Sequence, residues 1–337
     1  MNFLERAWYR KAGWLILLWP LAIVFQGLAA LRRSLQSINT RPDSVSVPIV
    51  VVGNITVGGT GKTPLLIALC QHLKTQGIHP GIISRGFGGK AANYPMLVGG
   101  NDSPAVVGDE ALLIARNTKC PVVVDPDRNS ALQHLLSREQ VDVVLSDDGL
   151  QHYKLFRDIE IVVVDGHRRF GNGLCLPAGP LRESVSRLDS VDFIIVNGAD
   201  GTEVRKEASA MEMEPKFLVN LATGEKRPFS GAPFNMGNTL QAVCGIGNPA
   251  RFYTALEKLP YLVEQFTFPD HHPFSLDDFV KAEIDNNQPV VMTEKDAVKC
   301  EDFAKNNFWY LQAEVNLQAA FLNEFTKKVK DSINDSN

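Results

Sequence analysis

A glycine-rich segment that ends in lysine and threonine has the clearest chemistry in this chain. It reads Thr56-Val57-Gly58-Gly59-Thr60-Gly61-Lys62-Thr63 and lies between an apolar run (47–52) and an amphipathic stretch (64–76). Glycines allow consecutive backbone N–H groups to face one point, and the N-terminus of a following helix favours an anion there. Lys62 would reach the terminal phosphates of a nucleotide, and the Thr63 hydroxyl would bind its Mg²⁺. The segment predicts a phosphate-binding loop; a glycine-rich turn with an incidental lysine is the alternative.

The spacing of this segment departs from the usual phosphate-loop pattern, G-x-x-x-x-G-K-[ST], at its first position. Counted back from Gly61, a glycine is expected at position 56, where this chain has Thr56 and carries its early glycines at 58 and 59. Pro64 still fits the first turn of a helix, because an N–H at that position would have no intrahelical partner. We therefore keep the prediction of a strand, a phosphate loop and a helix.

Two adjacent acids stand at the end of the predicted strand 141–147. Asp147 and Asp148 lie at the end of this predicted strand, where an aspartate of phosphate-loop proteins holds the nucleotide's Mg²⁺ directly or through water. Two carboxylates in one site repel each other unless a cation lies between them. Aspartate is also common in turns, so capping the following turn is the alternative for each.

A second acidic pair, Asp109 and Glu110, opens a predicted helix. In the structural interpretation Asp109 is the N-cap and Glu110 complements the helix dipole. In the catalytic interpretation Asp109 accepts a hydroxyl proton and Glu110 lies near the metal. The spacing alone does not choose between the two.

Two loops offer further polar groups. The stretch 268–274 places Asp270 beside His271 and His272 between two prolines, which suits an oriented acid–base group or a partner for a distant carboxylate. The stretch 176–183 presents Arg182, which could meet a transferring phosphoryl group or pair with Glu183 on the surface.

The elements that must position these residues alternate between strand and helix. Apolar runs predict strands at 47–52, 81–84, 121–125, 141–147, 159–165 and 191–196, with helices at 64–76, 109–117 and 128–137. Such alternation predicts an α/β fold of the phosphate-loop NTPase type, with a mainly parallel sheet covered by helices on both faces. We expect three parts: an N-terminal helical anchor (1–38), a phosphate-loop core (39–200) and a smaller α/β domain (201–337).

The smaller domain has its own predicted elements. These are strands at 217–221, 240–244 and 290–293, a helix at 249–258 and a C-terminal helix near 317–331. We expect its sheet to face the first domain across a cleft, where a ligand would bind.

The N-terminal segment is apolar from Trp14 to Leu31 apart from Gln26, and Pro20 and Gly27 interrupt it. Basic residues flank both ends, so the charge bias of a membrane span is missing. A helix lying in the membrane interface, with arginines on anionic lipid, accounts for both flanks. A signal peptide, a true span and a buried core helix are the alternatives.

Composition narrows the remaining function classes. The 337 residues carry a net charge of −4, and residues 1–41 contain six basic residues and one acid, which leaves −9 for the rest. That remainder argues against nucleic-acid binding. The five cysteines lie far apart without metal-ligand spacing, so neither a disulfide framework nor a zinc site is predicted.

The motifs together resemble the tetraacyldisaccharide 4′-kinases over nearly the whole chain. The resemblance rests on the shifted glycine pattern, on Asp147-Asp148-Gly149-Leu150-Gln151-His152, and on the segments 84–88, 108–110, 176–183, 268–271 and 293–299 in the same order. It implies transfer of the γ-phosphate of ATP to the 4′-hydroxyl of tetraacyldisaccharide 1-phosphate, giving lipid IVA in lipid A biosynthesis. It also implies Mg²⁺ and a location on the cytoplasmic face of a bacterial inner membrane, with no obligatory protein partner.

Carried over by position, the resemblance assigns roles to residues. It makes Asp109 the base and His271 its partner, with His272 as the alternative. It also places Arg182 and His152 at the active site, with less defined roles. This chain has Phe87 where the family often has tyrosine. The resemblance assigns no role to Lys295.

Two other protein classes share a variant phosphate loop. Nucleotide-switched membrane scaffolds place a lysine just before the paired glycines, where this chain has Val57. A metallochaperone needs a metal-transfer pair of cysteines, which the spacing does not offer. Val57 therefore counts against a membrane scaffold, and the cysteine spacing counts against a metallochaperone.

Overall fold

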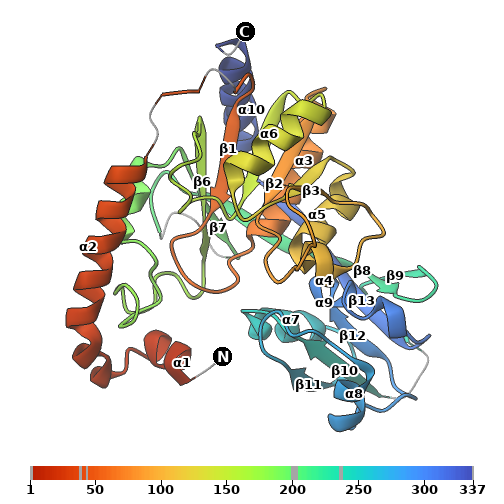
Figure 1. Ribbon diagram of the computed structural model, residues 1–337. Coiled ribbons are helices and arrows are strands. Elements are labelled where there is room, and N and C mark those ends of the chain that lie inside the picture. Colours follow the sequence, from red (N-terminus) through yellow and green to blue (C-terminus); the bar gives the residue numbers. More distant parts are fainter. Residues whose placement is uncertain (1–2, 38–39, 43–44, 199–203, 235–237, 336–337) are drawn as a thin grey trace.

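The computed structural model describes residues 3–37, 40–42, 45–198, 204–234 and 238–335 (Figure 1). The predicted domain boundaries at 38/39 and 200/201 fall on residues outside these ranges, so that division stays a prediction.

The strands form one continuous sheet of thirteen strands within the described residues, in the order β11-β10-β12-β13-β8-β7-β6-β1-β5-β2-β4-β3, with β9 paired to β8. Their bounds are β1 Ile49–Gly53, β2 Pro80–Ser84, β3 Met96–Leu97, β4 Val122–Val124, β5 Val143–Asp147, β6 Ile159–Asp165, β7 Phe193–Asn197, β8 Ser209–Asn220, β9 Lys226–Pro228, β10 Thr239–Cys244, β11 Leu262–Thr267, β12 Val290–Thr293 and β13 Phe308–Leu317. Only β3, β9 and the β8–β13 pair are antiparallel among these. The mainly parallel α/β fold is therefore confirmed.

The helices lie over both faces of the sheet. Their bounds are α1 Phe3–Arg10, α2 Trp19–Gln36, α3 Lys62–Thr75, α4 Pro104–Val107, α5 Asp109–Thr118, α6 Arg128–Arg138, α7 Pro249–Leu256, α8 Leu276–Lys281, α9 Glu294–Ala297 and α10 Ala319–Asn334. Short 3₁₀ turns cover Gly13–Leu18, Val185–Ser190 and Glu301–Phe303.

Strand β1 shows why the central strands are apolar at every position. Val50 and Val52 pack into a core with α3, α5 and α10, whereas Ile49 and Val51 pack on the opposite face with α6. A strand buried on both faces must be apolar throughout, unlike a half-exposed strand, which alternates. The run at 47–52 therefore marks the centre of the sheet.

The predicted smaller domain (201–337), called the second unit below, joins the first part of the chain in a way that the sequence did not predict. Its strands do not form a separate sheet facing the first: β8 pairs with β7 on one side and with β13 on the other, so the sheet continues through both units (Figure 1). The expectation of two facing sheets is wrong because the predicted strand at 217–221 is the end of a longer strand, β8, that starts beside β7.

The C-terminal helix also packs where the sequence did not indicate. Phe321, Phe325 and Val329 of α10 enter the core beneath β1 and α3, in the first unit. Phe193 of β7 contacts the rings of both phenylalanines. The chain thus returns to the first unit after completing the second.

The N-terminal segment stands apart from the sheet (Figure 1). Gly13–Gln36 is long and apolar enough to cross a membrane by length and composition, with a mean hydropathy of 2.0 and 11% of its most apolar stretch buried. Pro20 lies in the first turn of α2, after the 3₁₀ turn, so it begins the helix and does not interrupt it.

Candidate active site

The phosphate loop lies between β1 and α3, as the sequence predicts. Gly58 and Gly61 adopt φ values of +97° and +99°, which other residues rarely adopt. A Cβ on Gly61 would lie 2.2 Å from the side-chain nitrogen of Asn197, which donates a hydrogen bond of 2.9 Å to the carbonyl of Thr60. Asn197, at the end of β7, therefore holds the loop in shape.

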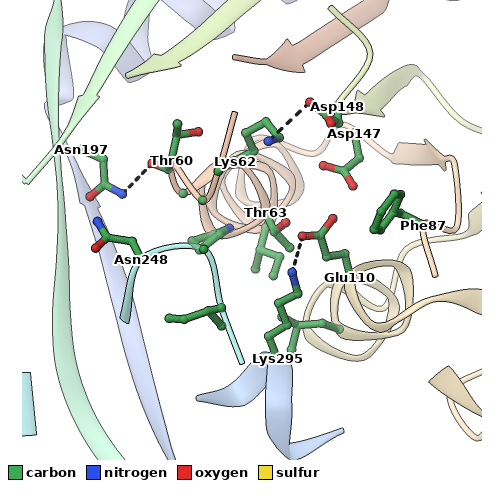
Figure 2. Close-up of a pocket in the computed structure, with 18 of the residues that line it drawn as sticks. Thr60, Lys62, Thr63, Phe87, Glu110, Asp147, Asp148, Asn197, Asn248 and Lys295 are labelled. Carbon is green, nitrogen blue, oxygen red and sulfur yellow. Dashed lines mark hydrogen bonds and ion pairs between the residues drawn. The ribbon is translucent and has the colours of Figure 1, made fainter. Parts of the chain in front are cut away.

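Asp148 is held by two cations. Its Oδ1 lies 3.4 Å from Nζ of Lys62, and its Oδ2 lies 3.3 Å from the guanidinium of Arg182 (Figure 2 shows the pair with Lys62). Burial opposes ionisation, but Lys62 and Arg182 more than offset it and lower the pKa of this carboxyl. Asp148 thus positions the lysine of the phosphate loop and Arg182.

Asp147 has a different environment one residue earlier. The parallel register places it beside Val52 of β1, and it lines the same cavity as the phosphate loop. It accepts a 3.3 Å hydrogen bond from Ser84, but its Oδ1 is buried with no hydrogen-bond partner among the described residues. Burial, together with the negative charges of Glu110 and Asp148, raises its pKa to about 7. A buried carboxylate with one oxygen left unpartnered suits the role of a cation ligand.

Glu110 points from the first turn of α5 toward the same space as Asp147 and Thr63 (Figure 2). Across the described residues there is no group of three or more His, Cys, Asp or Glu that could hold a metal by itself. Two carboxylates and a hydroxyl nevertheless match the way Mg²⁺ is bound with substrate phosphates and water.

Asp109 meets His271 across the two units. The imidazole Nδ1 lies 3.1 Å from Oδ2 and 3.3 Å from Oδ1 of Asp109, which is 5% exposed. Burial raises the pKa of Asp109, but the hydrogen bond to His271 and the charge of Lys295 more than offset it, so the pKa is lowered. An ionised carboxylate oriented by an imidazole can accept a proton from a hydroxyl group.

The conformation of His271 supports this orientation. Its φ is +60°, an unusual value for a residue with a side chain, and the ring of Phe87 packs on its imidazole with centroids 4.6 Å apart. His272, the alternative partner, instead faces Asp278 at 3.3 Å. Of the two neighbouring histidines, His271 is therefore the one that meets Asp109.

The phosphate loop, Asp147, Asp148, Glu110 and His271 line one cavity of about 1430 Å³, and Asp109 is buried behind His271. Arg182 and His152 line it as well, together with Phe25, Leu28 and Arg32 of α2. The cavity thus connects the phosphate loop with the apolar N-terminal helix.

A family model described as Tetraacyldisaccharide-1-P 4′-kinase matches residues 14–330. The chain belongs to this family. Its class, a phosphotransferase, is confirmed, and the switched-scaffold and metallochaperone alternatives are set aside.

Individual relatives agree with the family. The tetraacyldisaccharide 4′-kinase of Hahella chejuensis is 46% identical over 342 residues, covering 98% of this chain and 99% of that protein. The enzyme of the same name from Haemophilus influenzae is 45% identical, covering 92% and 91%. A solved structure, the "apo" form of LpxK from Aquifex aeolicus in complex with ATP, has a TM-score of 0.72 and 27% identity, covering 95% of this chain and 99% of that one.

Lys295 of this tetraacyldisaccharide-1-P 4′-kinase family member is a site residue whose role the sequence did not indicate. From α9 its Nζ lies 2.9 Å from Glu110, 3.2 Å from Nε2 of His271 and 3.5 Å from Asp270 (Figure 2 shows the contact with Glu110). Burial would lower its pKa, but the carboxylates of Glu110, Asp109 and Asp270 raise it. Lys295 therefore links the acidic pair of α5 to the histidine of the second unit.

Asn197 and Asn248 were also missed. Asn197 follows a predicted strand, and polar residues at such strand ends were a usable signal. Asn248 donates a 2.9 Å hydrogen bond to Asp165 at the end of β6, from a loop with no distinctive sequence pattern.

Proposed function

We propose that the chain transfers the γ-phosphate of ATP to the 4′-hydroxyl of tetraacyldisaccharide 1-phosphate, forming lipid IVA. The observation that carries the proposal is the Asp109–His271 pair: His271 lines the same cavity as the phosphate loop, and its imidazole Nδ1 lies 3.1 Å from the buried carboxylate of Asp109. A proton acceptor and a phosphate cradle in one cavity are what transfer to a hydroxyl group requires.

The phosphate loop would form the ATP-binding side of the site. Its backbone N–H groups and Lys62 would bind the phosphates, and Lys62 is held in place by Asp148. Thr63, Asp147 and Glu110 would hold Mg²⁺, which when bound would neutralise charge on the phosphates. The unpartnered Oδ1 of Asp147 and its raised pKa support this set. Asp148, included in the predicted metal set, already has two cationic partners.

Asp109 would act on the sugar hydroxyl group that accepts the phosphate. The 4′-oxygen attacks the γ-phosphorus, the bond from phosphorus to the β–γ bridging oxygen breaks, and ADP leaves while the hydroxyl proton passes to Asp109. His271 keeps the carboxylate oriented, and Arg182 would stabilise charge on the transferring group.

A lipid acceptor would account for the exposed apolar side chains of the N-terminal segment. Ile16, Leu17 and Leu28 are 71%, 77% and 61% exposed, and Leu28 also lines the cavity. Exposed apolar side chains with basic flanks favour insertion at an anionic membrane surface. We place the chain at the cytoplasmic face of the inner membrane, held by Gly13–Gln36, with the cavity open to the lipid layer.

The test is transfer of label from γ-labelled ATP to tetraacyldisaccharide 1-phosphate in detergent micelles. We expect labelled lipid from the wild type and none above background from Lys62→Ala. ATP hydrolysis by the wild type without labelled lipid would overturn the proposal.

A further inference from the structure

The first helix, α1, buries one face against the catalytic unit. Trp8 is 5% exposed and Ala7 is 6% exposed, whereas Phe3 at the start of the helix is 78% exposed and stacks on Trp14. A membrane-bound helix would instead leave its large apolar residues exposed in the absence of lipid. The inner face of α1 therefore has a protein partner.

That partner is the phosphate loop together with the loop that carries Arg182. Trp8 and Ala7 cluster with Val57 of the phosphate loop and with Leu176. The indole N–H of Trp8 also donates a 3.0 Å hydrogen bond to the carbonyl of Pro177. The indole thus contacts the loop that carries Arg182 directly and shares an apolar cluster with Val57 of the phosphate loop.

The two loops are themselves joined by backbone hydrogen bonds. The N–H of Val57 donates to the carbonyl of Pro180 at 2.9 Å, and the N–H of Arg182 donates to the carbonyl of Ile55 at 2.7 Å. A shift of either loop would move the other, because these bonds leave little freedom between them. Packing on Val57 therefore fixes the start of the phosphate loop.

Tyr9, which follows Trp8 in α1, is linked through Arg168 to a second segment that approaches the phosphate loop. The guanidinium of Arg168 lies 5.4 Å from the ring centroid of Tyr9 and donates a 2.7 Å hydrogen bond to the carbonyl of Gly247. Gly247 is in close approach to the loop, since a Cβ there would lie 2.6 Å from the backbone nitrogen of Gly59.

We infer that α1 braces the phosphate loop and that Trp8 is a positioning residue for the nucleotide, acting through Val57. The inference rests on the proposed nucleotide site and adds a role to the N-terminal segment besides membrane attachment. Backbone N–H groups bind phosphate only while they converge on one point. Loss of the indole would let the loop relax and weaken nucleotide binding, while the lipid-facing helix α2 stays intact.

The experiment compares Trp8→Ala with Phe3→Ala, which removes an exposed aromatic ring from the start of the same helix. We would measure the Kd of a fluorescent ATP analogue with Mg²⁺ in detergent, and the KM for tetraacyldisaccharide 1-phosphate at saturating ATP. We expect Trp8→Ala to raise the Kd about tenfold, the loss of about one charge-assisted hydrogen bond, with the acceptor KM within about twofold. We expect Phe3→Ala to match the wild type in both.

Wild-type ATP affinity in Trp8→Ala would overturn the inference, as would equal losses in nucleotide and acceptor binding. Should Trp8→Ala not fold, Trp8→Phe decides, because it removes the N–H bonded to Pro177 and keeps an aromatic ring. A rise of about two- to fivefold in Kd is expected for that variant, and unchanged affinity would overturn the inference. A wild-type chain that binds no ATP analogue would instead refute the proposed function.

Discussion

His152 should make the folded protein sensitive to acid. It lies at the edge of the active-site cavity, and burial, reinforced by the charges of Arg128, Arg85 and Arg32, lowers its pKa from 6.5 to about 4. Above pH 6.5 the imidazole is neutral in both the folded and unfolded chain. Between pH 6.5 and 4 the unfolded chain takes up a proton that the folded chain does not, so stability falls as the pH falls.

The size of the effect follows from the shift. A difference of about 2.5 pH units between the two states corresponds to about 3 kcal/mol of unfolding free energy in the acid limit. Because the unfolded group titrates first, about 2 kcal/mol of this is lost between pH 7.5 and pH 5.0. The substitution His152→Gln removes the titrating group and keeps a polar side chain of similar length.

The assay is urea unfolding of the wild type, His152→Gln and His79→Gln at a series of pH values from 7.5 to 5.0. His79 has a side chain that is 78% exposed and serves as the matched control. We expect the wild type and the control to lose about 2 kcal/mol more than His152→Gln over this range. Parallel losses in all three proteins would refute the reasoning that the cationic, buried surroundings keep His152 neutral.

Three further predictions test the site. Asp109→Asn should lower kcat by about 10²- to 10⁴-fold, because it removes the proton acceptor, while the Kd for the ATP analogue stays within about twofold; near-normal turnover would exclude Asp109 as the base. Lys295→Met should lower the free energy of unfolding, measured in urea at pH 7.5, by about 3 kcal/mol, because it leaves the carboxylates of Glu110 and Asp109 without their shared cation. Lys295→Arg should recover part of this loss. Equal stability of Lys295→Met and the wild type would contradict the proposed ion pairs. Chelation of divalent cations should abolish label transfer and added Mg²⁺ should restore it; undiminished transfer in chelator would remove the metal from the mechanism.

The phosphate loop shows what sequence can predict. Its glycine spacing, the preceding apolar run and the following helix are local features, and the observed β1 and α3 lie within about two residues of the predicted ranges. The acids after the strand at 141–147 were found in the same way, because parallel strands bring their polar ends to one edge of the sheet. The sequence left open what each acid does. Only the tertiary surroundings place Asp148 between two cations and leave one oxygen of Asp147, Oδ1, without a hydrogen-bond partner among the described residues.

The sequence by itself determined most strands and helices between residues 47 and 197, the position of the phosphate loop and the apolar character of the N-terminal segment, because each depends on residues close together in the chain. It missed β11 and β13 of the second unit and the first half of β8. The tertiary structure decided that His271 and not His272 meets Asp109, that Lys295 joins them, and that α10 returns to the first unit. Asp109 and His271 are 162 positions apart, and no local pattern encodes a contact over that separation. Packing of the second unit against the first brings such residues together, and packing depends on the shapes of all the surfaces that meet.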